Sequence, residues 1–162
     1  MAKYRARLSK ATKARIDKVV DIYTQDTVRA GGTEELHPEY GVSINDLLQM
    51  HADGYSYKGR LVPSRPVINE ARMRFAMKWR KSYAMDIKRK QKRKKEGGLT
   101  ERQIRNSEKR IGAEMVLDIQ SLFGDATVLK SNAELTKAMK GGFDAPLQLT
   151  GDLMRGIDFE IT

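Results

Sequence analysis

Residues 145–162 read APLQLTGDLMRGIDFEIT, and no other stretch of the chain specifies its local structure so fully. Pro146 fixes the backbone at the entry, and Thr150 is a favourable N-cap for a short helical turn that Gly156 ends. The last six residues, 157–162, then alternate between apolar and polar side chains. This alternation is typical of a β-strand with one buried and one solvated face. We therefore expect the chain to end on a strand that is tied into a sheet.

The composition indicates a single domain over residues 1–162 with a modest core. Hydrophobic residues make up 40% of the chain and charged residues 32%, a balance typical of long solvated helices around a small core. Cysteine is absent, which excludes disulfides and cysteine-ligated metals. The sequence has no apolar run long enough for a transmembrane helix, and its basic N-terminus lacks the apolar segment of a secretory signal. The default compartment is the cytoplasm.

Three helices are expected outside the centre of the chain. The first runs from Tyr4 to about Val28, where a helical apolar stripe is followed by the helix stop Gly31-Gly32. The second runs from Ile44 to about Ala52, because Ser43 is a suitable N-cap. A third, short helix extends from Asn132 through Ala138.

The centre of the chain predicts an antiparallel hairpin of two long helices. Pro66 suits the first turn of the first helix, and residues 88–98 form an exposed basic tip between the two. Thr100 and Gln103 make a capping box that begins the second helix, which Gly124 closes. The first helix has an apolar face that consists of Ile68, Ala71, Phe75, Trp79, Tyr83 and Ile87. At this spacing its aromatic rings are expected in the core rather than in a ligand cage.

Strand signals are weaker than helix signals. Leu36, Tyr40 and Val42 are compatible with a short strand, and residues 55–61 read as a loop or an irregular strand. Asp125 to Leu129 is a further candidate strand. With the C-terminal strand, these elements predict an α+β fold. Its small antiparallel or mixed sheet packs with the N-terminal helix and the long helical hairpin with its basic tip.

The sequence gives little support for catalysis. His37 and His51 lie in different expected elements, and a lone histidine is more often an ordinary polar residue than a ligand. The carboxylates near the C-terminus are Asp144, Asp152, Asp158 and Glu160. Asp152 favours the dipole of the capped turn, and the last two form the solvated face of the strand. We therefore expect no enzyme, no cofactor and no metal site.

A run of seven cations is the sharpest electrostatic feature of the sequence. Its members fall within eight positions and are Lys88, Arg89, Lys90, Lys92, Arg93, Lys94 and Lys95. The formal net charge is +10, and outside the run basic and acidic residues nearly balance. The run suits the phosphates of a nucleic acid, an acidic protein surface, or a solvated helix tip that aids solubility. These three interpretations stay open.

Two upstream segments resemble elements of a known family. Residues 41–54 (GVSINDLLQMHADG) are similar to a short helix that ends in a His-Glu-aromatic-Gly signature, with Ala52-Asp53 in place of Glu and the aromatic residue. Residues 62–66 (VPSRP) resemble a Pro-x-Arg-Pro-Phe element, with Val67 in place of Phe.

The C-terminal stretch carries the third resemblance, in the same order along the chain. Residues 145–161 are similar to a closing Pro-Leu-x-x-Thr-Gly-x-Leu-x-x-Ser-Ile signature, with Gly156 at the Ser position. Upstream of it, Arg110-Ile111-Gly112 stands where the family has an Ile-Gly helix start. The family is the virion-morphogenesis, neck and tail-completion group of tailed bacteriophages, which includes the Mu-type morphogenesis protein.

The resemblance implies a non-enzymatic structural protein of the virion neck or tail, present in the host cytoplasm during assembly. It implies a homo-oligomeric ring at the head–tail junction, six-fold in preference to twelve-fold. Its neighbours would be a portal-side connector or adaptor protein and a tail terminator or tail tube protein, with packaged DNA in the channel and no membrane. The residues expected at interfaces are Pro63, Arg65, Pro66, Leu149, Thr150, Gly151, Asp152 and Leu153. The alternative function is a basic nucleic-acid-binding protein that acts through Lys88–Lys95.

Overall fold

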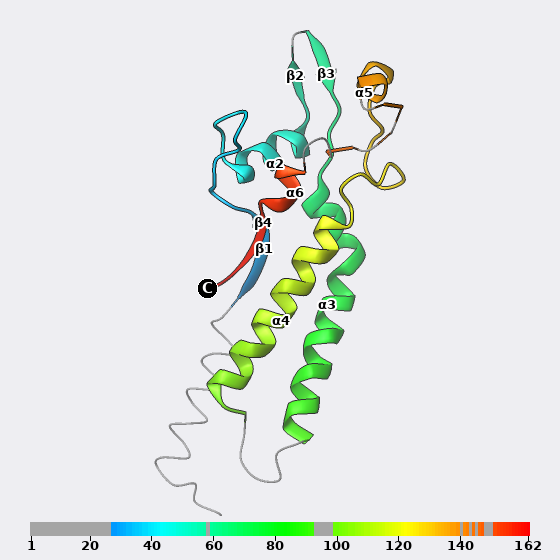
Figure 1. The fold of residues 1–162 in the computed structure, drawn as a ribbon. Coiled ribbons are helices and arrows are strands. Elements are labelled where there is room, and N and C mark those ends of the chain that lie inside the picture. The colour runs from blue at the N-terminus through cyan, green and yellow to red at the C-terminus, as the bar shows by residue number, and fades with distance from the viewer. Residues whose placement is uncertain are drawn as a thin grey trace, which may run out of the picture.

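Two long antiparallel helices dominate the fold, and two small sheets lie beside them and beyond one end (Figure 1). The computed structural model describes residues 27–57, 59–92, 99–139, 141–142, 144, 146–147 and 151–162. The elements in order are β1 (Val28–Gly32), α2 (Ile44–Asp53), β2 (Tyr55–Tyr57), β3 (Arg60–Val62), α3 (Val67–Lys92), α4 (Glu101–Gln120), α5 (Glu134–Met139), α6 (Asp152–Arg155) and β4 (Ile157–Ile161). The predicted α+β class is confirmed. The N-terminal helix expected from Tyr4 falls almost entirely on residues 1–26, outside the described residues.

The C-terminal strand is confirmed, and its partner is a strand that the sequence did not predict. β4 pairs antiparallel with β1, from Val28 opposite Ile161 to Gly32 opposite Ile157. Gly31-Gly32 is therefore a strand end and not the expected helix stop. The strand forms because β4 pairs with it, and glycine suits position 32 because a Cβ there would lie 2.8 Å from the backbone of Asn45 in α2.

The helix starts follow the capping signals of the sequence. Ser43 accepts a hydrogen bond from the backbone N–H of Asp46, and Thr100 and Gln103 form the expected reciprocal capping box. The short terminal turn differs from the prediction. α6 begins after Gly151, which occupies the N-cap position without a side-chain bond, whereas Thr150 lies outside the described residues.

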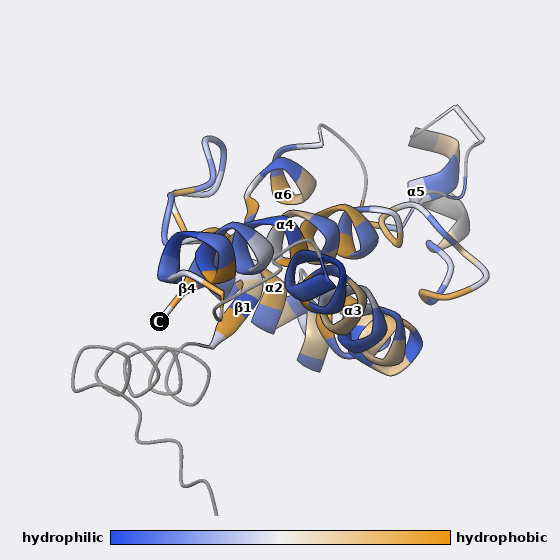
Figure 2. Ribbon diagram, turned by 90° about the horizontal axis from the view of Figure 1, so that it is seen from below, coloured by the Kyte–Doolittle hydropathy of each residue, from blue (hydrophilic) through white to orange (hydrophobic). Residues whose placement is uncertain are grey.

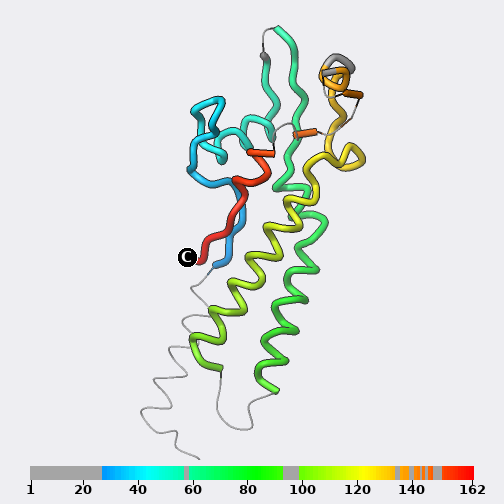
Figure 3. The backbone as a smooth tube through the Cα atoms, viewed as in Figure 1, coloured from blue at the N-terminus to red at the C-terminus, as the bar shows by residue number. Residues whose placement is uncertain are grey.

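Two of the weaker strand predictions need correction. Residues 125–129 form a turn in which Asp125 Oδ1 accepts from the backbone N–H of Thr127 at 2.8 Å. The region before α2 contains a single antiparallel bridge between Leu36 and Ser43 instead of a strand. Residues 55–61, expected as a loop or an irregular strand, form the antiparallel hairpin β2–β3, which projects at the top of the backbone trace (Figure 3).

The core consists of two clusters of buried side chains. The larger one joins α2, the start of α3, the end of α4, α6 and β4, and includes Ile44, Leu48, Val67, Ile119 and Ile157. Phe75 and Trp79 pack against it, as the helical spacing predicted. The smaller cluster, Ile87, Leu99 and Ile104, lies near the far end of the helix pair, where Tyr83 packs against it. The long helices are thus held together at both ends.

Candidate assembly surface

The three segments that resemble the phage family meet in one place, although about a hundred residues separate the first from the last. Ile44 and Leu47 of α2 share the larger core with Val67, which follows the proline connector, and with Leu153 and Ile157 of the C-terminal stretch. The three segments therefore bury apolar residues in one shared core. We call this shared core the motif core.

Gly156 explains one departure from the family signature, which has Ser at this position. Its backbone lies so close to α2 that a Cβ would sit 2.6 Å from Cγ1 of Ile44. A serine at position 156 would require the Ile44 side chain to move. The Ile-Gly pair at positions 111–112 also departs from expectation, because it lies inside α4 rather than at a helix start.

The connector between β3 and α3 is bonded to the end of α2. The Ser64 hydroxyl donates to the carbonyl oxygen of Ala52. The backbone N–H of Arg65 donates to the carbonyl oxygen of His51 at 2.6 Å. A Cβ on Gly54 would lie 2.9 Å from both Ser64 N and the Val62 carbonyl oxygen, so glycine suits this close approach. The first two family segments therefore form one continuous bonded unit.

Arg65 is buried, with 5% of its surface exposed. Its Nε donates to the carbonyl oxygen of Lys130 at 2.7 Å, and its Nη2 donates to the Ser131 carbonyl oxygen at 3.0 Å and to Asn132 Oδ1 at 3.3 Å. Burial lowers the pKa of Arg65, while the nearby carboxylate of Asp144 opposes that shift. The guanidinium thus ties the loop after α4 to the connector, and these contacts lie within one chain.

Asp144 continues this network on the far side of the loop. It accepts a hydrogen bond from the backbone N–H of Asn132 at 2.8 Å and pairs with Lys137 of α5 at 3.4 Å. The bond from Asn132 is the main reason that the pKa of Asp144 lies below its usual value. This carboxylate therefore serves the loop structure.

His51 gives the motif core a pH dependence. Burial, with a smaller contribution from the charge of Arg65, lowers the pKa of His51 to about 4. The unfolded chain binds this proton near pH 6.5, so between pH 6.5 and 4 the unfolded state holds more protons and stability falls as the pH falls. Allowing for partial exposure, we expect this residue to lower the free energy of unfolding by about 1–2 kcal/mol between pH 7 and pH 5.

Urea unfolding of the wild type and of His51→Gln at both pH values measures this contribution. The glutamine variant lacks the titrating group, so its loss between pH 7 and pH 5 should be smaller by the stated amount. An equal loss in both proteins would show that His51 does not couple protonation to folding.

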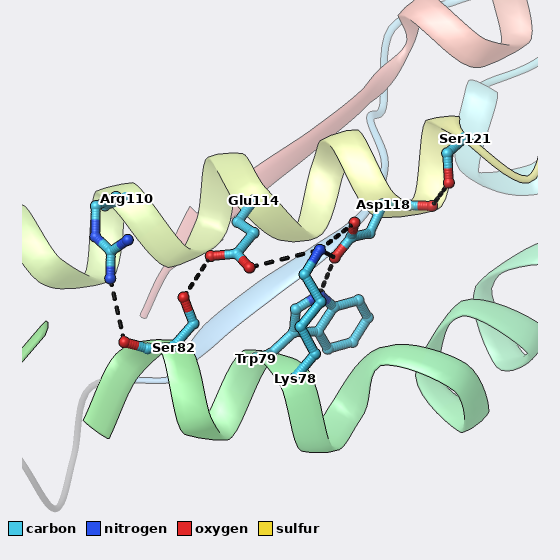
Figure 4. A network of polar contacts seen from close by, with 7 residues as sticks. All are labelled: Lys78, Trp79, Ser82, Arg110, Glu114, Asp118 and Ser121. Atoms are coloured by element: carbon cyan, nitrogen blue, oxygen red, sulfur yellow. Dashed lines mark hydrogen bonds and ion pairs between the residues drawn. The ribbon is translucent and has the colours of Figure 1, made fainter. Parts of the chain in front are cut away.

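A polar network fastens α3 to α4 (Figure 4). Asp118 accepts from Lys78 Nζ at 2.7 Å and from Trp79 Nε1 at 2.8 Å. One turn away, Ser82 Oγ donates to Glu114 at 2.7 Å. Trp79 thus packs its ring against the core and satisfies its N–H across the helix pair. Two of the four acidic residues of α4 are engaged by α3 here.

Among the described residues of the predicted basic run, Lys90 does not belong to the exposed surface. Lys90 turns into the helix pair, where its Nζ lies 2.9 Å from Asp86 and 2.6 Å from Ser107 Oγ. Lys88, Arg89 and Lys92 are exposed on α3. Arg93, Lys94 and Lys95 lie outside the described residues. Within the described part, three of the four cations of the run therefore point to solvent.

The exposed basic surface extends well beyond that run. α3 carries nine basic and two acidic residues, whereas α4 carries four of each. The side of α3 that faces away from α4 presents exposed cations together with exposed methionines. We call this surface the cationic face of α3, and its members are Met73, Met77, Arg80, Lys81, Met85 and Lys88. Plotting residues 67–92 around a helix would have revealed it from the sequence.

A second surface, of negative charge, is carried by the segment that precedes α2. Residues 33–57 contain five acidic residues and no lysine or arginine. We call residues 33–46 the acidic loop, which connects β1 to α2 and continues into the first turn of α2. Its exposed side chains include four carboxylates and two large apolar or aromatic residues, namely Glu34, Glu35, Leu36, Glu39, Tyr40 and Asp46. The absence of cations over this length is the signal that a reading of motifs alone overlooked.

The residues expected at interfaces lie mostly in or near the motif core. Leu153 is buried in it, and Pro63, Pro66, Gly151 and Asp152 are half-buried around it. Together with buried Arg65, they pack in the interior of the molecule or at its margin. Leu149 and Thr150 lie outside the described residues.

Asp152, Asp158 and His37 have local partners. Asp152 pairs with Arg155, and Asp158 Oδ1 accepts from the backbone N–H of Phe159 at 2.7 Å. His37 Nδ1 accepts from the backbone N–H of Glu39 at 3.2 Å. In the described residues, no group of three or more His, Asp or Glu side chains is arranged to hold a metal ion.

No protein-family model, curated protein or solved structure matches this chain. Among the helices that the structure describes, none is both long enough and apolar enough to cross a membrane.

Proposed function

We propose that this protein is a structural component of a tailed-phage virion that forms a homo-oligomeric ring at the head–tail junction. The observation that carries the proposal is the motif core. Three segments resemble the neck and tail-completion family in the family's order, and all three contribute to one core, in which α2 directly contacts each of the other two.

The surface of the subunit also suits an assembly. Leu61 on the β2–β3 hairpin is 83% exposed, Met73 on α3 is 80% exposed and Leu36 in the acidic loop is 66% exposed. On α3, Met77 and Met85 are exposed as well as Met73, and apolar side chains that gather on one element are typical of surfaces that become buried between proteins. These three elements lie around the motif core on different sides of the subunit (Figure 1).

The two ends of the elongated subunit suggest how it would sit in the neck. One end carries the β2–β3 hairpin, and the opposite end carries the exposed cations Lys88, Arg89 and Lys92 (Figure 3). In this proposal the hairpin contacts a neighbouring neck protein, either the portal-side connector or a tail protein. The cationic end faces packaged DNA or an acidic connector. A six-fold ring is favoured over a twelve-fold ring by the resemblance alone.

Two measurements test the proposal: the protein composition of virions and the particles that form when the gene is silenced. Mass spectrometry of purified virions should detect this chain in stoichiometric amounts. Infections in which its gene is silenced should yield DNA-filled heads and separate, unattached tails. Complete infectious particles that lack the chain would refute the proposal.

A basic nucleic-acid-binding protein is the second candidate. It is favoured by the observation that Lys88, Arg89 and Lys92 are exposed and make no ion pair with the described residues. Replacing the three with glutamine should reduce the salt dependence of DNA binding by about one unit of slope per lost phosphate contact. Normal virion assembly in that variant would restrict the three cations to a DNA-side or solubility role.

A further inference from the structure

The acidic loop and the cationic face of α3 are complementary in charge and similar in chemical composition. The loop combines exposed carboxylates with Leu36 and Tyr40. The cationic face combines exposed cations with Met73, Met77 and Met85. Arg80, Lys81 and Lys88 form no ion pair with any described residue, and neither do the side chains of Glu35 and Glu39.

The two surfaces lie on opposite sides of the subunit. The acidic loop directly follows β1, and its first residue is tied to the residue before β4, since the N–H of Thr33 donates to the carbonyl oxygen of Gly156 at 3.0 Å. β1 and β4 pack against one side of α4, and α3 packs against another. In Figure 1 the loop therefore lies at the left and α3 at the right, with α4 between them, and the view from below again separates the β1–β4 sheet from α3 (Figure 2). One subunit cannot bring the two surfaces together.

We propose that the acidic loop of one subunit docks on the cationic face of α3 of the next subunit. This inference rests on the proposed ring and specifies which surfaces close it. Glu35 and Glu39 would meet Arg80 and Lys81, while Leu36 and Tyr40 of the loop would lie against the methionines. Met73 and Met85 are twelve residues apart, so this part of α3 extends about 18 Å, a length that a loop of about seven residues can cover.

The charge pattern also determines the symmetry of the contact. A two-fold contact that places either surface against its own copy brings like charges together, which opposes binding. A two-fold contact that pairs the loop of each copy with the helix face of the other needs both surfaces to face one partner, whereas they lie on opposite sides of the molecule. A head-to-tail contact pairs the opposite charges without this conflict. Contacts of this heterologous kind form closed rings when the rotation between subunits permits.

The exposed methionines of the cationic face favour a protein loop over DNA as its binding partner. Phosphates are bound by cations and hydrogen-bond donors, and they offer no apolar surface for three thioether side chains. A protein loop that carries both carboxylates and apolar side chains can pair with the cations of the cationic face and pack against its methionines. Such a loop is present in this chain itself, so a second copy supplies the complementary surface.

Charge reversal provides the first experiment. Glu35→Lys with Glu39→Lys reverses the loop, and Arg80→Glu with Lys81→Glu reverses the helix face. Each double variant places like charges at the proposed contact and should weaken self-association at least about a hundredfold in sedimentation or mass photometry. Because the loop-reversed and helix-reversed proteins complement each other, mixing them in equal amounts should restore multimers.

A matched control uses the other long helix. Arg102 and Lys109 are exposed on α4, and changing both to Glu alters the net charge as much as the helix-face reversal does. This control should associate like the wild type. It separates a specific contact from the general effect of a lower positive charge.

Disulfide trapping provides the second experiment, because the chain has no native cysteine. Glu39→Cys combined with Lys81→Cys should yield, on oxidation of the purified protein, a ladder of covalent multimers. Either cysteine alone should leave the protein monomeric under the same oxidation, because the proposed contact brings position 39 to position 81 and never to its own copy. A ladder requires each subunit to be linked through two different surfaces, so a two-fold contact cannot produce it.

The outcomes separate this inference from the proposed function. Multimers that are lost in each reversed variant, regained on mixing and trapped as a ladder support the contact. Wild-type multimers that neither reversal disturbs overturn the contact while leaving the ring proposal intact. A wild-type protein that stays monomeric at its highest soluble concentration and gives no ladder also overturns the contact. The presence of the chain in virions then decides the ring proposal separately.

Discussion

Arg65→Ala is expected to lower the free energy of unfolding by about 3–4 kcal/mol. The substitution removes a buried cation that donates to Lys130, Ser131 and Asn132, residues about 65 positions later in the chain. It leaves two carbonyl oxygens and an amide oxygen without their donor, and a buried acceptor that loses its partner retains its desolvation cost. The loop after α4 would then separate from the proline connector.

Urea unfolding at pH 7 measures the effect, with two further variants for comparison. Arg65→Lys keeps the charge but cannot donate in three directions at this fixed geometry, so we expect roughly half the loss. Arg60→Ala removes an exposed arginine from β3 and should change stability by less than about 0.5 kcal/mol. A loss for Arg65→Ala no larger than that for Arg60→Ala would mean that the buried network does not stabilise the fold.

Gly112→Val is the second substitution with a large expected effect. Gly112 lies in the middle of α4, where β4 crosses the helix, and a Cβ at this position would lie only 2.2–2.7 Å from ring carbons of Phe159. A valine must therefore displace the ring and with it the C-terminal strand. We expect a loss of about 3 kcal/mol from overpacking, which the higher helix propensity of valine relative to glycine offsets only slightly.

Two comparisons establish the cause. Phe159→Ala opens the space, so Gly112→Val combined with Phe159→Ala should be more stable than the sum of the single effects predicts by at least about 1 kcal/mol. Gly31→Val is the matched control, because a Cβ at Gly31 meets no atom within 4 Å and valine suits a strand. If the two glycine substitutions cost the same, close packing between α4 and β4 is not the reason for Gly112.

The parts of the fold that follow from the sequence are those set by neighbouring residues. The caps at Ser43 and Thr100 mark the starts of α2 and α4, and the alternation after Gly156 marks β4. Each of these signals acts within one or two turns or along a single strand, so a local reading identifies it.

The parts that were missed depend on contacts between distant segments. β1 contains two glycines and has little strand propensity of its own, and it is a strand because β4 supplies its hydrogen bonds more than a hundred residues later. Residues 125–129 have some strand character, but the Asp125 side chain bonds to Thr127 and closes a turn instead. The residues of a short segment do not show whether its backbone will bond to a distant strand, as in β1, or to a nearby side chain, as at Asp125.

In the candidate site, too, some features follow from neighbouring residues and others from contacts between distant segments. The proline connector and the C-terminal stretch stand out by their residues, but their meeting with α2 in the motif core is a property of the fold. The basic run was visible along the sequence, whereas the cationic face of α3 appears only when residues are placed around the helix. The inward turn of Lys90 toward Asp86 could not be read from a count of charges.

A cryo-electron-microscopy reconstruction of the head–tail junction tests whether copies of this chain form a ring there. We expect a closed ring of subunits with this fold, in which the acidic loop of each subunit lies on the cationic face of α3 of the next. A resolved neck in which every ring is built from other chains would refute the proposed ring.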